Sequence, residues 1–272
     1  MMRWTLLGSG TSTGVPAIGC RCSVCLSTHP RNKRTRCSLW IQYQDRSILI
    51  DTSVDLRQQA LREEIGRVDA VLFTHAHADH IYGLDGIRSF NFIQKTVIPC
   101  YGSAETLAAV KRAFSYIFSE SPSESAKPKM TAFPIAGSFT LLGLPVEPIP
   151  LLHGTMEVFG YRFGPAAYLT DCNRIPETSL AMLQGLDLLI LSAVGHRPHA
   201  THFNLAEALQ IIALLSPKRA FLTHLSHHFD YEEISSSLPE SVSLAYDGLR
   251  IEIPLSREET GVTAAHLGGE AR

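Results

Sequence analysis

The sequence predicts an α/β protein folded as a four-layer αβ/βα sandwich, with two sheets packed face to face and helices on their outer sides. Three observations support this prediction. Short apolar or alternating runs, which are typical of strands, fill the N-terminal part of the chain. Beyond them, strand-like runs alternate with stretches whose apolar residues recur at helical spacing. The second half repeats this order, so each half can supply one sheet and the helices that cover it.

The first half is expected to contain strands, followed by alternating helices and strands. Asp45 and Arg46 should turn the second and third strands into a hairpin, and Ser53 should cap the helix that follows. The expected elements are strands at 4–7, 38–43 and 47–50, a helix at 55–65, a strand at 70–73, a short helix at 86–92, a strand at 97–101 and a helix at 104–118.

The second half is expected to form a longer series of the same kind. Its elements are strands at 139–142, 146–152, 158–163 and 166–170, a helix at 177–183, a strand at 186–191, a helix at 205–215 and a strand at 220–223. Residues 119–129, rich in serine, proline and lysine, are expected to form an exposed loop. We therefore expect a single domain over residues 1–254 and a mobile tail over 255–272.

Composition and charge are those of a globular protein that has no strong preference for polyanions. Of the 272 residues, 45% are hydrophobic and 18% are charged, which is enough for a sizeable core. The formal net charge is -2, so no overall field favours nucleic acid or an anionic membrane. No apolar run approaches the roughly 18 residues of a membrane span, and Met1 to Trp4 lead into a strand rather than a signal segment. These features predict a cytoplasmic protein.

Four side chains that bind metals follow the apolar strand at 70–73. They are His75, His77, Asp79 and His80, in the order H-x-H-x-D-H. A turn at the end of a strand can direct ligands to two sides, so one loop can serve two cations. Neutral imidazole suits zinc, iron or manganese, and a carboxylate offsets the charge of the cation. The cluster therefore predicts a two-metal site rather than a histidine-rich surface loop.

Further candidate ligands close other predicted strands. His153, Asp171 and His224 each follow an apolar run directly. Together they complete the ligand sets of two cations, although any one of them alone could equally be a polar loop residue. Asp51 also ends a strand, where it is either a carboxylate that supports the site or a turn residue.

Three of the six cysteines are crowded into one short segment, at Cys20, Cys22 and Cys25. This spacing suits a metal ion better than disulfides, and a reduced, metal-free loop is the alternative. The other cysteines lack such spacing and are expected in the interior: Cys37, Cys100 and Cys172.

The order of the ligands resembles that of the dinuclear hydrolases of the metallo-β-lactamase fold, and the resemblance extends from about residue 4 to residue 253. It implies two cations that share Asp171 as a bridging ligand. The other ligands would form one set of His75, His77 and His153 and a second set of Asp79, His80 and His224. An aspartate in the cluster, with no cysteine among these ligands, is similar to the phosphodiesterase branch of the fold.

Two further motifs resemble one family of this branch, the cyclic-phosphate phosphodiesterases of the carbon-phosphorus lyase pathway of phosphonate degradation. The first motif covers residues 8–25 and the second covers residues 223–227. In that family a structural zinc ion is bound by residues that correspond here to Cys20, Cys22, Cys25 and His227. A closed set of three cysteines and one histidine is typical of structural rather than catalytic zinc.

His202 resembles the additional active-site histidine of the same family, which is not a metal ligand, and His199 is the competing candidate. The resemblance implies a phosphodiesterase with two divalent ions, zinc or manganese, acting on small substrates such as phosphoribosyl 1,2-cyclic phosphate or 2′,3′-cyclic nucleotides. Paired cations roughly 3.5 to 4 Å apart activate water for attack on phosphorus. Asp79 would hold or deprotonate this water. His202 would protonate the leaving alkoxide or stabilise the anionic transition state.

Two other functions are compatible with the same ligands. A tRNA 3′-processing endonuclease shares their order, but its protruding arm has no evident basic, glycine-rich counterpart here, so nucleic acid is not the expected partner. A metal-binding sensor without turnover is the second such function, and the complete ligand set argues against it.

The basic run at 31–36 is interpreted either as a phosphate-binding segment or as a solvated loop. A homodimer is compatible with the sequence.

Overall fold

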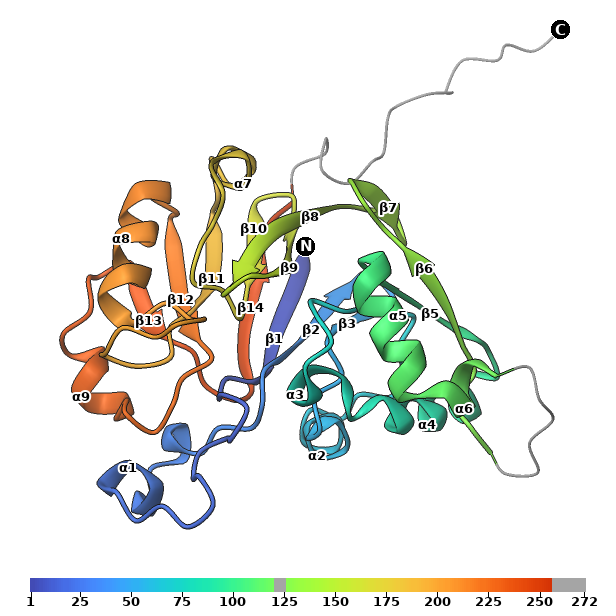
Figure 1. The fold of residues 1–272 in the computed structure, drawn as a ribbon, viewed down its shortest axis with the longest axis horizontal. Helices are drawn as coiled ribbons and strands as arrows, with labels where there is room; N and C mark the ends of the chain where they lie inside the picture. Colours follow the sequence, from blue (N-terminus) through green and yellow to red (C-terminus); the bar gives the residue numbers. More distant parts are fainter. Residues whose placement is uncertain (120–125, 256–272) are drawn as a thin grey trace, which may run out of the picture.

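The computed structural model describes residues 1–119 and 126–255 and contains two seven-stranded sheets (Figure 1). The strands of the first sheet, in spatial order, are β14 (Leu249–Ile253), β1 (Met2–Gly8), β2 (Ser38–Tyr43), β3 (Arg46–Ile50), β4 (Ala70–Leu72), β5 (Ile98–Gly102) and β6 (Met130–Pro134). The pairs from β14 to β3 are antiparallel, and those from β3 to β6 are parallel. Parallel strands place their carboxyl ends at the same edge of the sheet, where ligands gather.

The second sheet has the same mixed character. Its strands, in spatial order, are β13 (Val242–Leu244), β12 (Arg219–Thr223), β11 (Leu188–Ser192), β10 (Ala166–Leu169), β9 (Met156–Phe163), β8 (Leu144–His153) and β7 (Phe139–Leu141). β10 to β13 are parallel, and β7 to β10 are antiparallel. The carboxyl ends of β10 and β12 therefore lie at one edge of this sheet.

Helices cover the outer face of each sheet (Figure 1). The described α-helices are α1 (Ser23–Leu26), α2 (Leu56–Arg62), α3 (Ala78–Ile81), α4 (Ile87–Gln94), α5 (Ala104–Ala113), α6 (Ser115–Phe118), α7 (Glu177–Met182), α8 (Leu205–Leu215) and α9 (Tyr231–Ser235). Two 3-10 turns, η1 (Pro30–Asn32) and η2 (Leu84–Gly86), complete the list. The predicted four-layer αβ/βα sandwich is confirmed.

Three apolar layers hold the sandwich together. The central layer lies between the sheets and includes Trp4 and Tyr161. Trp4 also meets the ring of Phe163 edge-on, with centroids 6.0 Å apart. The outer layers lie under the helices, where Val71 belongs to the first sheet's layer and Ile212 of α8 to the second's. Each fully buried aliphatic side chain contributes roughly 1.5–3 kcal/mol, so these layers dominate the stability.

The predicted position of the first hairpin turn is wrong by one residue. Gln44 and Asp45 form the turn, and Arg46 already pairs with Tyr43 inside the sheet. Gln44 adopts a left-handed φ of 53°. The tight turn requires this conformation, and the residue types at positions 45 and 46 do not indicate that the turn begins at Gln44.

Two helix boundaries also differ from the prediction. Helix α2 begins after Asp55, and the hydroxyl of Ser53 instead accepts a hydrogen bond from the Asp55 N–H and donates one to Gln59. The helix expected over 104–118 is broken at Phe114, where φ is -121° and ψ is 47°. Both changes are local and leave the layers intact.

Three strands lie outside the elements predicted from the sequence: β6, β13 and β14. The last of these returns from the second half of the chain to pair with β1, so the final strand completes the first sheet. Figure 1 shows β14 beside β1.

The expected loop at 119–129 and the expected tail at 255–272 fall mostly outside the described residues. The single domain and the homodimer stay predictions.

In the described ranges, 1–119 and 126–255, no helix combines the length and the apolar character that a bilayer crossing requires.

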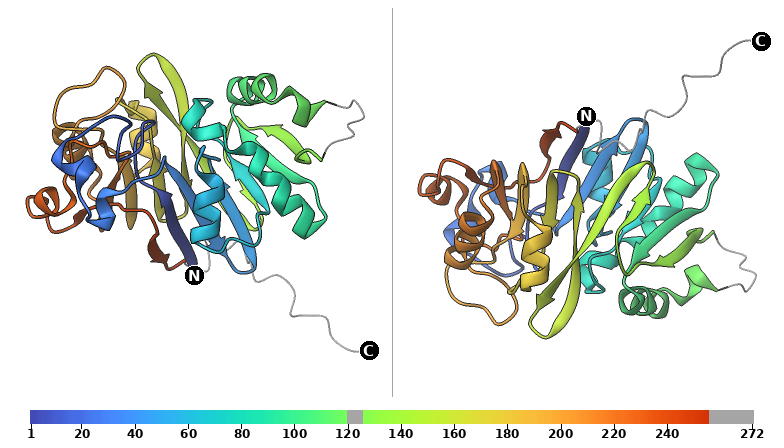
Figure 2. Two further views of the ribbon diagram at one scale, coloured as in Figure 1. Left: turned by 90° about the horizontal axis from the view of Figure 1, so that it is seen from below. Right: turned by 90° about the horizontal axis from the view of Figure 1, so that it is seen from above.

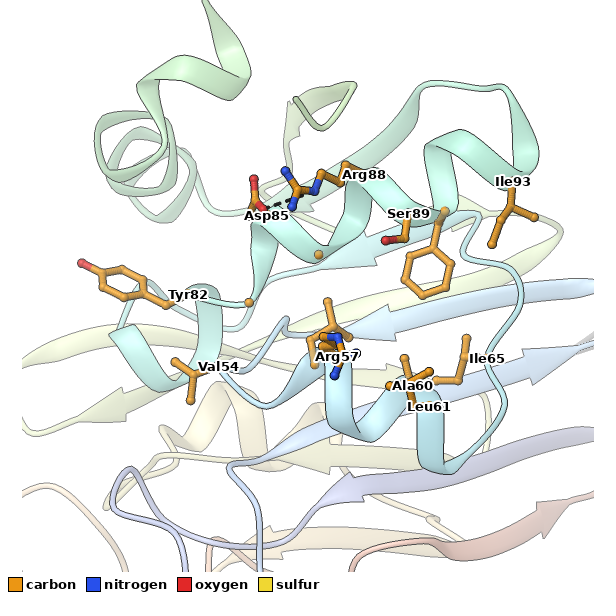
Figure 3. Close-up of a pocket in the computed structure, with 14 residues that line it drawn as sticks. Val54, Arg57, Ala60, Leu61, Ile65, Tyr82, Asp85, Arg88, Ser89 and Ile93 are labelled. Atoms are coloured by element: carbon orange, nitrogen blue, oxygen red, sulfur yellow. Dashed lines mark ion pairs between the residues drawn. The ribbon is translucent and has the colours of Figure 1, made fainter. Parts of the chain in front are cut away.

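A pocket of about 490 Å³ lies between α2 and α4 on the outer side of the first sheet (Figure 3). Leu61 and Ile93 line its apolar part, and Asp85 and Arg88 form an ion pair of 3.5 Å beside it. Arg57 also lines this pocket.

Candidate metal centre

The predicted ligands lie at strand ends from both sheets. The cluster from His75 to His80 follows β4, His153 ends β8, Asp171 follows β10 and His224 follows β12. Asp171 and His224 take left-handed φ values of 52° and 57° directly beyond their strands. This conformation is costly for most residues, by about 1–3 kcal/mol, and it turns a side chain sharply away from the direction of the strand. Surrounding contacts therefore hold these two ligands in place.

His75, His77 and His153 form the first ligand group. One nitrogen from each lies within 4.8 Å of the others. Nδ1 of His153 donates a hydrogen bond to the carbonyl of Thr201 at 2.8 Å, so this ring presents a bare Nε2. The Thr74 hydroxyl donates to Asp51 and can only accept from Nδ1 of His75, at 3.0 Å. Nε2 of His75 is therefore also a free lone pair, and it is buried without a hydrogen-bond partner.

Asp79, His80, Asp171 and His224 form the second ligand group. Nε2 of His80 lies 3.1 Å from Oδ2 of Asp171 and 3.3 Å from Oδ2 of Asp79. Nε2 of His224 lies 3.0 Å from Oδ1 of Asp171. Both imidazole nitrogens are buried, and neither has the alignment of a hydrogen bond. Ligand atoms held at about 2.1 Å from one cation are separated by about 3.0–3.4 Å, so these spacings fit a shared cation.

Asp51 supports the second ligand group through a hydrogen bond to His80. Its carboxylate accepts hydrogen bonds from Nδ1 of His80 at 2.7 Å and from the Thr74 N–H at 2.8 Å. Burial raises the pKa of Asp51 despite these contacts. The bond to Nδ1 leaves the Nε2 lone pair of His80 directed at the site, as the outer partner of a metal ligand does. Asp51 is thus both a supporting carboxylate and a left-handed turn residue, with φ 62°.

The charges around His80 also fit a cation. Burial lowers its pKa, but Asp171 and Asp51 outweigh burial and raise the pKa well above its usual value. The carboxylates therefore favour a positive charge at this position. A divalent ion would supply that charge and would leave His80 neutral, as a metal ligand must be.

His202 lies against both ligand groups, and its competitor does not. Its ring centroid is 4.6 Å from that of His153 and 4.7 Å from that of His224. The side chain is only 11% exposed, and Nδ1 lies 3.8 Å from Oδ1 of Asp171. His199 is exposed, and its Nδ1 accepts a hydrogen bond from the Thr201 N–H. The geometry favours His202 as the additional histidine, while its role stays a prediction.

The second predicted metal site is also assembled. Sγ atoms of Cys20, Cys22 and Cys25 lie 3.1, 3.7 and 3.4 Å from Nδ1 of His227. Sulfur and nitrogen ligands of one tetrahedral zinc ion are about 3.6 Å apart, so the set fits zinc. Burial raises the pKa of Cys25 to about 11, and a cation would offset this cost of the thiolate. All six cysteines are free thiols, and Cys37, Cys100 and Cys172 are buried as predicted.

We predict that Cys22→Ser removes one tightly held zinc ion per chain and lowers the melting temperature. The binding energy of a structural zinc is folding energy, and each kcal/mol shifts the midpoint by about 2–4 °C in a domain of this size. Metal analysis after mild chelation and thermal unfolding measure both effects. Arg21→Ala, an exposed change in the same loop, is the control and should retain the ion. A Cys22→Ser protein with normal zinc content and melting would contradict the assignment.

Both interpretations of the basic run are wrong for its central residue. Arg34 is only 2% exposed, and its guanidinium donates to the carbonyls of Ser226 at 2.9 Å and Phe229 at 2.8 Å. Burial lowers its pKa to about 10, which still leaves it charged at neutral pH. Arg34 therefore fixes the loop that carries His227 rather than meeting solvent or substrate.

Three supporting residues carry no distinctive sequence pattern: Thr74, Thr201 and Arg34. Thr74 and the Thr201 carbonyl each fix the tautomer of a histidine. Every residue has a backbone carbonyl, so the residue type at position 201 does not indicate that this carbonyl binds His153. The position of Thr74 directly before the histidine cluster is the one signal that could have identified it.

Most of the chain matches one superfamily. A family model described as a β-lactamase superfamily domain matches residues 46–225. The crystal structure of a new diphosphatase from the PhnP family is 42% identical in sequence, has a TM-score of 0.87, and the match covers 92% of this chain and 96% of that one. The chain therefore belongs to the β-lactamase superfamily. Within it, the protein is a member of the PhnP family, and it is a metal-dependent hydrolase of the phosphodiesterase type, as predicted.

Two curated relatives carry other names. The octanoyltransferase of Porphyromonas gingivalis is 37% identical over 259 residues, which are 91% of this chain. The ribonuclease Z of Bradyrhizobium diazoefficiens is 29% identical over 142 residues, which are 49% of this chain. The chain spans about half the length of both proteins, 51% and 46% respectively. Each name thus describes a protein that extends well beyond the matched part.

Proposed function

We propose that the protein hydrolyses small cyclic phosphodiesters, of which phosphoribosyl 1,2-cyclic phosphate and 2′,3′-cyclic nucleotides are representative. The observation that carries the proposal is the contact of His202 with both ligand groups, through His153 and His224. A nitrogen donor therefore stands where a substrate spanning both groups would place its phosphate. A role in phosphonate degradation is part of the same proposal and rests on the likeness to the PhnP family.

The charges of the site favour an anionic substrate. Asp79 and Asp171 are the carboxylates of the two ligand groups, and the remaining members are imidazoles. With two divalent cations bound, the ligands leave a net charge of about +2. This excess suits a phosphodiester anion, whose charge grows in the transition state, better than a neutral lactam or thioester.

Each group has a separate task in this proposal. Two bound cations would neutralise charge on the phosphoryl oxygens and lower the pKa of a water molecule. Asp79 is the partly exposed carboxylate of the site, with a side chain 12% accessible, and would orient this water. Burial raises the pKa of Asp79, but the neighbouring His80, whose Nε2 lies 3.3 Å from Oδ2 of Asp79, outweighs burial and lowers the pKa to about 2. Asp79 therefore remains a hydrogen-bond acceptor across the working pH range.

A substrate panel tests the proposal. The protein loaded with zinc or manganese is assayed on a 2′,3′-cyclic nucleotide, phosphoribosyl 1,2-cyclic phosphate, a nitrophenyl diester, a nucleoside diphosphate, a precursor tRNA, a lactam and a thioester. We expect the highest kcat/KM on the cyclic phosphodiesters. Cleavage of precursor tRNA alone would identify an endonuclease. Two bound cations without turnover of any substrate would identify a sensor.

A second candidate is hydrolysis of a diphosphate bond, because the relative with 42% identity is described as a diphosphatase. Attack on phosphorus and the required charges are the same for both substrates. The leaving groups differ, since a phosphate departs without a proton more easily than a sugar alkoxide does. A higher kcat/KM on the nucleoside diphosphate than on the cyclic phosphodiesters would favour this candidate.

A further inference from the structure

The pocket between α2 and α4 is a concave site separate from both candidate metal sites. Its volume of about 490 Å³ lies within the range of roughly 300–1,000 Å³ that is typical of small-molecule pockets. None of the described residues that line it belongs to a candidate ligand group. In both views of Figure 2, α2 and α4 lie on the opposite side of the molecule from α8 and α9. The pocket is therefore available to a ligand of its own.

One end of the pocket is apolar and open to solvent. Leu61 of α2 and Ile93 of α4 line it and are 62% and 66% exposed. Ile65 and Phe90 line the same pocket and belong to the apolar layer beneath the helices. Figure 3 shows Leu61, Ile65 and Ile93 at the same end of the pocket. An exposed, concave apolar surface of this kind is typical of a binding site for an apolar group.

Positive charge adjoins this apolar end. Arg57 and Arg88 line the pocket, and both are exposed. Within residues 1–119 and 126–255, Arg57 takes part in no ion pair or hydrogen bond. Asp85 is the one acidic residue of the described lining. Its Oδ2 lies 3.5 Å from Nε of Arg88, and its Oδ1 accepts a hydrogen bond from the Tyr116 hydroxyl at 2.7 Å. An exposed ion pair contributes little, so both guanidinium groups are available to an anion.

We propose that the pocket binds a small amphiphilic anion, whose apolar chain lies between α2 and α4 and whose carboxylate or phosphate head contacts Arg57 and Arg88. A guanidinium binds either head through two parallel hydrogen bonds. A second copy of the chain fits less well, because a two-fold contact across the pocket would bring the arginines of both copies together. The inference goes beyond the proposed function, since the ligand binds outside the metal centre.

A series of ligands that share one head and differ in chain length tests the proposal. Calorimetric titration of the zinc-loaded protein with linear carboxylates should show an affinity that rises about three- to fourfold for each methylene group buried. Decanoate and decyl phosphate should both bind, which compares the two heads, whereas acetate and decylammonium should not bind the pocket. A carboxylate can also bind metal ions, so decanoate is titrated again in excess acetate. Its affinity should stay the same, because acetate lacks the chain.

Two substitutions of exposed residues separate the head from the chain. Arg57→Ala should weaken the binding of decanoate by about five- to tenfold and leave that of the neutral decanol unchanged, and Arg57→Lys should restore part of the loss. Leu61→Asp should weaken decanoate and decanol alike, because it places a charge in the apolar end. Arg112→Ala removes an equal charge from an exposed position of α5 outside the pocket. This control should bind decanoate as the wild type does.

Three results would overturn the inference. The first is a wild-type protein that binds neither decanoate nor decyl phosphate. The second is binding that Arg57→Ala and Leu61→Asp both leave unchanged, since the ligand would then lie elsewhere. The third is a dimer that Leu61→Asp converts to a monomer, with no binding of amphiphiles, which would assign the pocket to a second copy of the chain. Hydrolysis of cyclic phosphodiesters is measured separately, so its failure would reject the proposed function and leave this inference standing.

Discussion

Asp171→Ala should release both active-site cations and abolish hydrolysis, whereas the loss of a terminal ligand should weaken mainly one cation. The two oxygens of Asp171 face different ligands, with Oδ1 3.0 Å from Nε2 of His224 and Oδ2 3.1 Å from Nε2 of His80. One oxygen of Asp171 also lies within 4.8 Å of a nitrogen of His153, a member of the first group. A carboxylate in this position would contribute to both cations at once.

The energetic reason is the repulsion between the cations. Two divalent ions about 4 Å apart repel each other by roughly 17 kcal/mol at an effective dielectric constant of about 20. A carboxylate between them offsets much of this repulsion. Burial raises the pKa of Asp171, but the charges of His224 and His80 outweigh it and hold the pKa well below the usual value. Asp171 is therefore ionised whenever the site binds metal.

Metal analysis after dialysis, together with kcat on a nitrophenyl diester, measures the result. We expect the active-site metal content of Asp171→Ala to fall from about two ions per chain to less than one. Asp171→Asn should be intermediate, because it keeps an oxygen but loses the charge. Asp187→Ala is the control, since this carboxylate pairs with Lys218 at 2.8 Å away from the ligands. Full metal content with normal kinetics in Asp171→Ala would leave Asp171 a loop residue.

The layers of the fold could be predicted because buried strands and amphipathic helices have different periods. β2 and α8 were predicted with the bounds that the structure shows. β14 was not predicted, although Leu249, Ile251 and Ile253 alternate with polar residues. Its alternation indicates a strand but not a partner, and the pairing with β1 joins the two ends of the domain. β13 has three residues, too few for a reliable pattern.

The ligands could be predicted for a different reason. Histidine and aspartate placed directly after apolar runs are unusual, and strands bring such positions to a common edge. The distances between His80, Asp171 and His224 depend on the register of two sheets, which no single segment encodes. The role of Arg34 was missed because the sequence alone does not distinguish a buried arginine from a solvated one. Two of its acceptors, the carbonyls of Ser226 and Phe229, lie far along the chain.

His202→Ala should keep its metals and its fold yet lose roughly 10²–10³ in kcat, and the loss should be similar for good and poor leaving groups. Burial lowers the pKa of His202 to about 3, with the charge of His224 adding to the effect and Asp171 only partly offsetting it. The imidazole is therefore neutral at neutral pH and cannot deliver a proton in the way an imidazolium does. It can donate one N–H bond, which serves to stabilise the anionic transition state.

The position of His202 supports this role. Its Nδ1 is buried without a hydrogen-bond partner, a costly arrangement that a phosphoryl oxygen of the substrate would relieve. A donor that is fixed before the reaction acts on developing charge whatever the leaving group is. His202→Asn should therefore recover part of the lost rate, because an amide donates a hydrogen bond but supplies no proton.

Three measurements distinguish a general acid from a hydrogen-bond donor that stabilises the transition state, the two roles considered for His202. The variants are compared on a nitrophenyl diester and on a 2′,3′-cyclic nucleotide, and His199→Ala serves as the control because that ring is exposed. The kcat of the wild type should show no inflection from this histidine between about pH 5 and 8, whereas an unperturbed imidazole would titrate near 6.5. A large defect confined to the cyclic nucleotide, with no recovery in His202→Asn, would show that substrate binding restores the proton and makes His202 a general acid. Normal rates on both substrates would remove it from the reaction.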